Sequence, residues 1–351
     1  MTDMVNVEML QLARESRGLT QQRLSQLTSI SQGRISKFER GEAPIPNKEL
    51  TQIARALDYP NSFFYQHGQH HGFGVSGVFH RRRQSINMIT LKRIQADFNI
   101  RTMEIQKLLD GAEIQSENEF HRLDIEDFYG DAEHVANLVR AQWNLPIGPI
   151  KSIIGVIESA GGIVFKYDLG SRKLDAQSRW ISGLPPLFFA NKNIPTDRLR
   201  FTLAHEIGHV IMHRIPTKDI EDEANRFASS FLMPRREILP DLAPFSLERA
   251  MRLKLKWKVS IAALIMRAFD LGVVTKSQKR RLFTLMGVAG YRTTEPVLLP
   301  DEEPVIVHRL IYSYLEDQGY TTAELCRILS IHATDFRVRY LKKPPLRIRR
   351  F

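Results

Sequence analysis

The chain has 351 residues and a net charge of +11, with 43% hydrophobic and 25% charged residues. This length is too great for one hydrophobic core and predicts two or three domains. The sequence has no run of 18 apolar residues and no signal-peptide pattern, so we expect a cytoplasmic protein that does not enter a membrane. Its single cysteine, Cys326, excludes an internal disulfide and a cysteine-rich zinc finger. Any metal must therefore be bound by histidines and carboxylates.

Residues 1–70 are predicted to form short helices with tight turns. Thr20 is a suitable N-cap for a helix that starts near Gln21, and residues 28–30 form a turn. A second helix follows from Ser31 to Arg40 and is closed by Gly41. Glutamine and arginine side chains near the start of this second helix suit the edges of adenine and guanine in the major groove. The pattern indicates a helix-turn-helix that reads DNA.

Residues 6–65 resemble the XRE (Cro/CI-type) helix-turn-helix family. The resemblance is carried by Thr20-Gln21, Leu24, Ser31-Gln32, Ile35, Phe38-Glu39 and Gly41. It implies a fold of five short helices, a homodimer, a palindromic operator in double-stranded DNA, phosphate contacts by Gln21 and Arg40, and base contacts by Gln32, Arg34 and Lys37. The full set of expected DNA-binding residues is Gln21, Ser31, Gln32, Arg34, Ser36, Lys37 and Arg40. Gly33 stands where the family often has a base-reading side chain, and use of the domain for protein contacts alone is the alternative.

A connecting region and an α+β domain are predicted next. Residues 71–130 contain a glycine-rich linker at 71–77, a helical connector over about 85–112 and an acidic loop. In residues 131–245, Asp131 is expected to cap a helix, short buried strands are expected at 163–165 and 187–190, and helices over 197–232. The expected fold class is mainly α with a small β component: an N-terminal five-helix domain, a central α+β zincin-like domain and a helical C-terminal region.

A zinc site is predicted on the helix that contains His205, Glu206 and His209. Histidines four residues apart lie one turn apart on one helix face, so both imidazoles can reach one tetrahedral Zn²⁺. Glu206 lies beside that face and can take a proton from a zinc-bound water. His213 continues the row, but about 12 Å of straight helix separates it from His205. We therefore expect His213 to support the site and not to bind the same ion.

A third protein ligand is expected from the next helix. Glu223 precedes Phe227 and Phe231 by four and eight residues, which places it in line with the apolar stripe. A carboxylate in that position is costly unless it is paired or bound to a metal. Glu223 is therefore the predicted ligand, and Glu221, at the start of the helix, is the second choice.

Residues 132–291 resemble the ImmA/IrrE family of metallopeptidases. The matching motifs are Trp143-Asn144-Leu145-Pro146, the run from Arg198 to Glu206, the run from Glu223 to Ala228, and Leu232-Met233-Pro234. The resemblance implies a zinc protease that relieves repression by cutting a repressor of the helix-turn-helix type. Here the repressor-like and protease-like parts share one chain. A structural zinc, or a site that has lost its metal, is the alternative.

The C-terminal region, residues 246–351, is strongly basic. Residues 249–292 contain 11 Lys and Arg against one acid, and residues 337–350 contain seven against none. Two interpretations remain open: a second nucleic-acid contact surface, for which Lys254, Lys256 and Lys258 are the candidates, or solvated helix faces.

The sequence thus predicts a prokaryotic transcriptional regulator with a zinc-dependent metallopeptidase domain that acts on a repressor or on itself. The first alternative is an antitoxin-like or stress-responsive repressor whose zinc domain is a non-proteolytic sensor or dimerisation module. The second is a protease that its N-terminal domain recruits to a repressor.

Overall fold

The computed structural model describes residues 4–67, 86–214 and 218–341, which divide into two compact units. Unit 1 comprises residues 4–67, 86–114 and 305–341 of this set, and unit 2 comprises 115–214 and 218–304. The described residues are 59% helical and hold three strands, which confirms the expected fold class. The glycine-rich stretch 71–77, expected to be a linker, lies outside the described residues. Among the described helices, none combines the length and the hydropathy needed to cross a membrane.

The first part of unit 1 is a bundle of short helices. Its elements are α1 (Val7–Ser16), α2 (Gln21–Thr28), α3 (Gln32–Glu39), α4 (Asn47–Leu57) and the short 3₁₀ helix η1 (Asn61–Tyr65). The Thr20 hydroxyl accepts a hydrogen bond from the backbone N–H of Arg23 at 3.1 Å, so Thr20 caps α2 as expected. Leu24, Ile35 and Phe38 are fully buried, and they hold α2 and α3 against the other helices.

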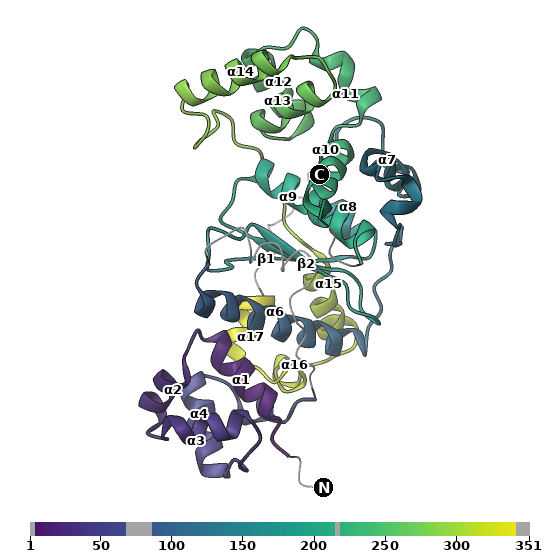
Figure 1. The fold of residues 1–351 in the computed structure, drawn as a ribbon. Helices are drawn as coiled ribbons and strands as arrows, with labels where there is room; N and C mark the ends of the chain where they lie inside the picture. Colours follow the sequence, from purple (N-terminus) through teal and green to yellow (C-terminus); the bar gives the residue numbers. More distant parts are fainter. Residues whose placement is uncertain (1–3, 68–85, 215–217, 342–351) are drawn as a thin grey trace. The chain divides into compact units, whose positions relative to one another are not determined.

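A long helix, α6 (Met88–Leu109), completes this bundle. It packs along α1, and Ala96, Ile100 and Met103 join the buried cluster of the helix-turn-helix. Residues 305–341 return to the same helix as α15 (Ile306–Tyr312), the π-helical η3 (Ser313–Asp317), α16 (Thr322–Leu329) and α17 (Ala333–Tyr340), drawn in yellow beside the blue α6 in Figure 1. The helix-turn-helix therefore shares one core with an element outside it.

Buried polar contacts fix the returning segment to α6. The Glu104 carboxylate, 2% exposed, is paired with Arg339 at 2.6 Å and accepts a hydrogen bond from the Tyr340 hydroxyl. At the end of the helix, Tyr314 Oη donates to the carbonyl of Leu108 at 2.7 Å. Because each buried polar group here has a partner, the segment is an integral part of unit 1.

Unit 2 is built on a small mixed sheet. The strands are β1 (Ile163–Tyr167), β2 (Ala176–Arg179) and β3 (Leu187–Asn191), in the order β1-β3-β2. β3 is parallel to β1 and antiparallel to β2, so β2 is an edge strand. The expected strands correspond to β1 and β3, whereas β2 was not predicted. In chain order, the first helices of unit 2 are η2 (Ile125–Phe128), α7 (Ala132–Gln142), α8 (Ile153–Ser159), α9 (Thr196–Met212), α10 (Ile220–Leu232) and α11 (Arg235–Leu242).

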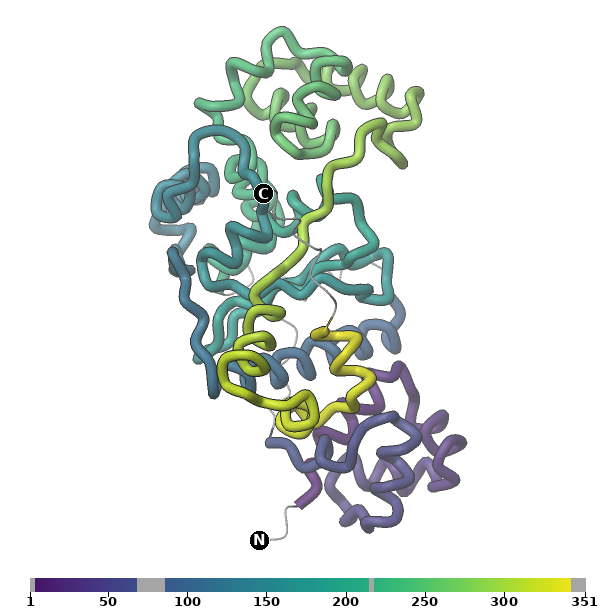
Figure 2. Tube along the Cα trace, turned by 180° about the vertical axis from the view of Figure 1, so that it is seen from behind, coloured from purple at the N-terminus to yellow at the C-terminus, as the bar shows by residue number. Residues whose placement is uncertain are grey.

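Helices α12 (Leu247–Trp257), α13 (Ile261–Asp270) and α14 (Lys276–Val288) follow and share the buried cluster of unit 2. The extended segment 295–304, which leaves α14 in Figure 2, carries acidic side chains onto three buried cations. Lys254 contacts Glu295 at 2.6 Å, Lys166 contacts Asp301 at 2.6 Å, and Arg200 contacts Glu302. Because Lys254 is 1% exposed and is neutralised by Asp197 and Glu295, the expectation that it contacts DNA is wrong.

Candidate metal centre and DNA-binding surface

Two histidines from α9 face each other at the seam between α9 and α10. His205 and His209 are 9% and 3% exposed, and their Nε2 atoms lie 2.9 Å apart. The seam is tight, because a Cβ added to Gly208 would come within 3.1 Å of Phe227 on α10. The absence of a side chain at Gly208 thus lets α10 approach the histidine face of α9.

In each of the two histidines, the partner of Nδ1 indicates which ring nitrogen carries the proton. His205 Nδ1 lies 3.0 Å from the Asn225 side-chain oxygen, an acceptor, so Nδ1 carries the proton. His209 Nδ1 lies 3.0 Å from His213 Nδ1, while His213 Nε2 lies 3.1 Å from a Glu223 carboxylate oxygen. His213 therefore donates through Nε2 and accepts through Nδ1, which places the His209 proton on its own Nδ1. These partners assign the tautomers.

His213 is suited to this accepting role. Burial, together with the neighbouring His209, lowers the pKa of His213 to about 3, although Glu221 acts in the opposite direction. Burial, with the charge of Asp219, raises the pKa of Glu223. His213 is consequently neutral near pH 7 and supports His209 from behind, as the sequence led us to expect.

The resulting donor set fits a divalent cation. Both Nε2 atoms present lone pairs to each other, and a Glu221 carboxylate oxygen lies 3.4 Å from His209 Nε2. One donor atom each from His205, His209 and Glu221 lie within 4.8 Å of one another. With these tautomers the three atoms are all acceptors, which repel one another at such distances, and a cation among them removes that repulsion. Two imidazoles and one carboxylate form a ligand set that zinc uses in catalytic sites.

The structure brings Glu221, and not Glu223, to the histidine pair. Glu221 and Asn225 lie one turn apart on the side of α10 that faces α9, whereas Glu223 reaches the end of α9 at His213. Helical spacing aligns Glu223 with the apolar stripe, but α9 meets the side of α10 that carries Glu221 and Asn225. A signal was present in the i, i+4 spacing of Glu221 and Asn225, which matches the spacing of the two histidines.

The edge strand β2 holds the side chain of Glu206 through hydrogen bonds from Ser178. Its side chain is fully buried, and Oε2 accepts hydrogen bonds from Ser178 N at 2.8 Å and Ser178 Oγ at 2.6 Å. Oε1 is buried and has no hydrogen-bond partner among the described residues. Ser178 lies on β2, so sequence reasoning missed this contact together with the strand. The two bonds hold the carboxylate in one orientation and leave one oxygen available to a further proton.

The expected DNA-contacting side chains lie along α3 and at the start of α2. Ser31, Gln32, Arg34, Lys37 and Arg40 are exposed, and Ser36 is half-buried. Gln32 Nε2 donates to Gln21 Oε1 at 2.8 Å, which joins the starts of α2 and α3. Arg34 and Arg40 are paired with Glu49 and Glu42 at 2.9 and 2.6 Å, so each must leave its partner to contact DNA.

An ion pair behind α3 supports this surface and was missed in the sequence. Arg14, 7% exposed, donates to both Glu39 oxygens at 2.6 and 2.8 Å, and Gln21 donates to Glu39 at 2.8 Å. Arg14 and Glu39 are 25 residues apart, so no local pattern links them. The pair fixes Gln21 against α3.

These features define a class of protein in which a helix-turn-helix unit is joined to a unit with a candidate metal centre. A helix-turn-helix family model matches residues 10–61, and the model of the IrrE N-terminal-like domain matches residues 157–269. The chain is therefore a fusion of an XRE-type helix-turn-helix domain with an IrrE/ImmA-like domain. The second match includes β2, α9 and α10, and so all residues of the candidate metal centre. No curated protein gives a significant match to the chain.

Proposed function

We propose that this chain is a cytoplasmic transcriptional regulator that binds operator DNA through α3 and hydrolyses peptide bonds at a zinc site formed by His205, His209 and Glu221. The single observation that carries the proposal is the convergence of three proton-free acceptors at the seam between α9 and α10, beside a glutamate held by the edge strand. The helix-turn-helix and IrrE-like matches support the two activities separately.

The chemistry follows from the positions of the side chains. A Zn²⁺ ion at this site would supply a Lewis acid that polarises the peptide carbonyl and the attacking water. Asn225 and His213 hold the two imidazoles with Nε2 toward the site. Ser178 holds Oε2 of Glu206, so Oε1 is the atom that takes the proton of the water and later passes it to the leaving nitrogen.

The metal assignment predicts different zinc contents for two neighbouring variants. Purified chain is expected to hold about one Zn²⁺, and His205→Ala and Glu221→Gln should each lose it, because a three-ligand site does not retain zinc well with two. Glu223→Gln should still fill at saturating zinc, because it alters only the support behind His209, with a loss of affinity of about 10–100-fold. Metal analysis and zinc titration measure both. Retention of zinc by Glu221→Gln with loss from Glu223→Gln would return the third ligand to Glu223.

The DNA assignment predicts a base-specific loss in one variant. Gln32→Ala should cost roughly 1–3 kcal/mol at one base position of a site selected from random duplex DNA, because one base contact is removed. The control is Gln52→Ala, an exposed glutamine on α4. Binding of wild type and both variants to all single-base variants of the selected site measures the effect. An equal loss on every sequence would identify Gln32 as a phosphate contact.

We favour a separate repressor as substrate over the chain's own linker. A cut between residues 67 and 86 would leave the helix-turn-helix packed on α6, because Ala96, Ile100 and Met103 belong to its buried cluster. Such a cut does not by itself release the DNA-binding helices. A homodimer on a palindromic site is proposed because helix-turn-helix domains read two half-sites one helical turn apart.

A non-proteolytic zinc sensor is the second candidate. The observation that favours it is the pair of hydrogen bonds from Ser178, which stabilise Glu206 as a buried carboxylate and give it a structural contact independent of any substrate. In that case the metal would stabilise the seam between α9 and α10 and would take no part in hydrolysis.

A further inference from the structure

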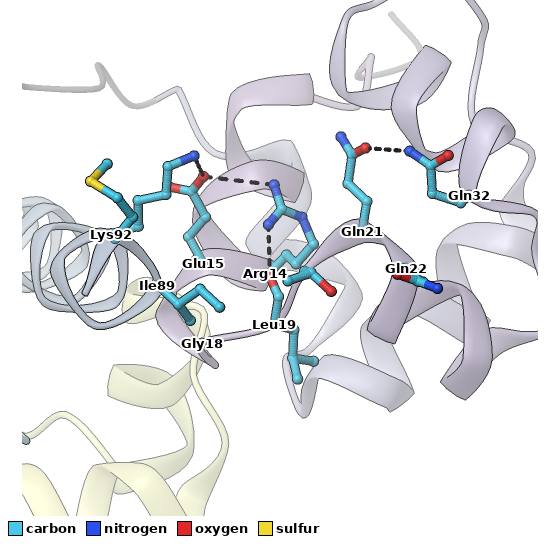
Figure 3. Close-up of a pocket in the computed structure, with 11 residues that line it drawn as sticks. Arg14, Glu15, Gly18, Leu19, Gln21, Gln22, Gln32, Ile89 and Lys92 are labelled. Atoms are coloured by element: carbon cyan, nitrogen blue, oxygen red, sulfur yellow. Dashed lines mark hydrogen bonds and ion pairs between the residues drawn. The ribbon is translucent and has the colours of Figure 1, made fainter.

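A cavity of about 630 Å³ lies within unit 1, between the helix-turn-helix and the start of α6. Leu19, Gln21 and Gln32 line it on one side, and Ile89 and Lys92 line it on the other. Figure 3 shows Lys92 and Gln32 at opposite ends of this cavity, with Arg14 and Glu15 between them. One wall thus belongs to the DNA-reading motif, and the other to a helix outside the matched segment 10–61.

The wall formed by α6 is firmly placed. Gly18, at a φ of +65°, turns the chain between α1 and α2, and a Cβ added there would lie 3.5 Å from the Arg93 side chain and 4.0 Å from Ile89. The start of α6 is therefore in contact with the turn that leads into α2. Lys92 is fixed relative to the helix-turn-helix by this packing as well as by the shared core further along α6.

The two cationic side chains that line the cavity, Arg14 and Lys92, differ in burial and in the number of their partners. Arg14 is buried and bound to both Glu39 oxygens and to the carbonyl of Leu19. The Lys92 side chain is 52% exposed, and its ion-pair partner among the described residues is the Glu15 carboxylate at 3.2 Å. The buried Glu15 carboxylate also accepts a hydrogen bond from Gln11 at 3.0 Å and lies 3.7 Å from Arg14, so it keeps partners when an anion in the cavity takes Lys92.

We propose that this cavity receives the sugar–phosphate backbone of the DNA strand next to the bases read by α3, and that Lys92 contacts a phosphate there. The inference rests on the proposed DNA binding. The first helix of a helix-turn-helix crosses the backbone while the second reads the groove, and α2 forms one wall of the cavity. Gln21 and Gln32, bonded to each other, belong both to that wall and to the reading surface. Helix α6 therefore extends the DNA interface beyond the helix-turn-helix.

The test is the salt dependence of binding to the site selected from random duplex DNA. Lys92→Gln should lower the log–log salt slope by roughly 0.9 per bound chain and weaken binding roughly three- to tenfold near 0.1 M salt, because one phosphate contact is lost. Lys92→Arg should keep the wild-type slope. The matched control is Arg198→Gln in unit 2, which removes one positive charge from an ion pair with Asp175 in which the side chains are 57% and 16% exposed.

Each outcome of this test decides one assignment. If Lys92→Gln and Arg198→Gln give the same slope and affinity while Gln32→Ala weakens binding, α6 does not contact DNA and the inference is overturned, while the proposed DNA reading stands. If wild type selects no site from random duplex DNA, the proposed DNA binding is wrong and the inference fails with it. Because Lys92 is half-exposed, loss of folding does not obscure the result, and a thermal melt of each variant verifies this.

Discussion

Replacing Glu206 with glutamine should lower peptide hydrolysis by about 10²–10⁴-fold, because the variant lacks the group that accepts the proton of the attacking water. Glutamine has nearly the same shape as glutamate, and its carbonyl oxygen can still accept the hydrogen bonds from Ser178 N and Oγ. The variant is therefore expected to keep its fold, its zinc and its DNA binding. Cleavage of a synthetic peptide library, read by mass spectrometry, measures the activity of both proteins.

Two controls separate proteolysis from sensing. Glu126→Gln alters an exposed glutamate of unit 2 outside the metal centre and should leave cleavage unchanged. Size analysis of the chain in cells shows whether it cuts itself. Equal cleavage by wild type and Glu206→Gln would show that Glu206 is not the base. If zinc-loaded wild type cleaves neither peptides nor protein while zinc still alters DNA binding, the sensor hypothesis takes first place.

Replacing Glu302 with alanine should destabilise unit 2 by about 3–5 kcal/mol, because it leaves the charge of Arg200 buried without its counter-ion. Arg200 is fully buried, and within the described part of the chain its remaining hydrogen bonds go to the carbonyls of Ile150 and Lys258. Glu302 also accepts hydrogen bonds from Ser152 Oγ at 2.7 Å and Ile154 N at 3.1 Å at the start of α8. Urea unfolding, followed by a signal from unit 2, measures the change.

The matched control is Glu248→Ala, which removes the carboxylate of an exposed Glu–Arg pair on α12. Both side chains of that pair are more than two-thirds exposed, at 72% and 69%, so the expected loss is below about 1 kcal/mol. A loss of similar size in both variants would mean that Arg200 finds water or another partner when Glu302 is absent.

Local patterns predicted the parts of the site that lie within one helix. The spacing of His205 and His209, the cap at Thr20 and the apolar faces of α2 and α3 each depend on neighbours within four residues. The family resemblances then indicated the two domains, and the family models match both of them. Helix periodicity could not decide between Glu221 and Glu223, because the choice depends on which side of α10 meets α9.

Contacts between distant segments were beyond the sequence argument. Ser178 and Glu206 are 28 residues apart, and Arg200 and Glu302 are 102 residues apart. The strand β2 has the residues Ala-Gln-Ser-Arg, which lack the β-branched and aromatic side chains that mark a strand. Hydrogen bonding to β3 stabilises β2 as a strand, although its side chains do not favour one. Lys254 was a candidate nucleic-acid contact for a similar reason, because its acidic partner Glu295 lies far from it in the sequence, after the basic helix.

The return of residues 305–341 to α6 has a consequence for biosynthesis. A ribosome makes the helix-turn-helix and α6 first, then all of unit 2, and only afterwards the segment that supplies Arg339 and Tyr340 to Glu104. Until that moment Glu104 lacks both partners, and the face of α6 that they cover is open to solvent. Unit 1 is therefore finished after unit 2 has been translated, so a fully assembled DNA-binding unit always comes with its metal-binding unit already made.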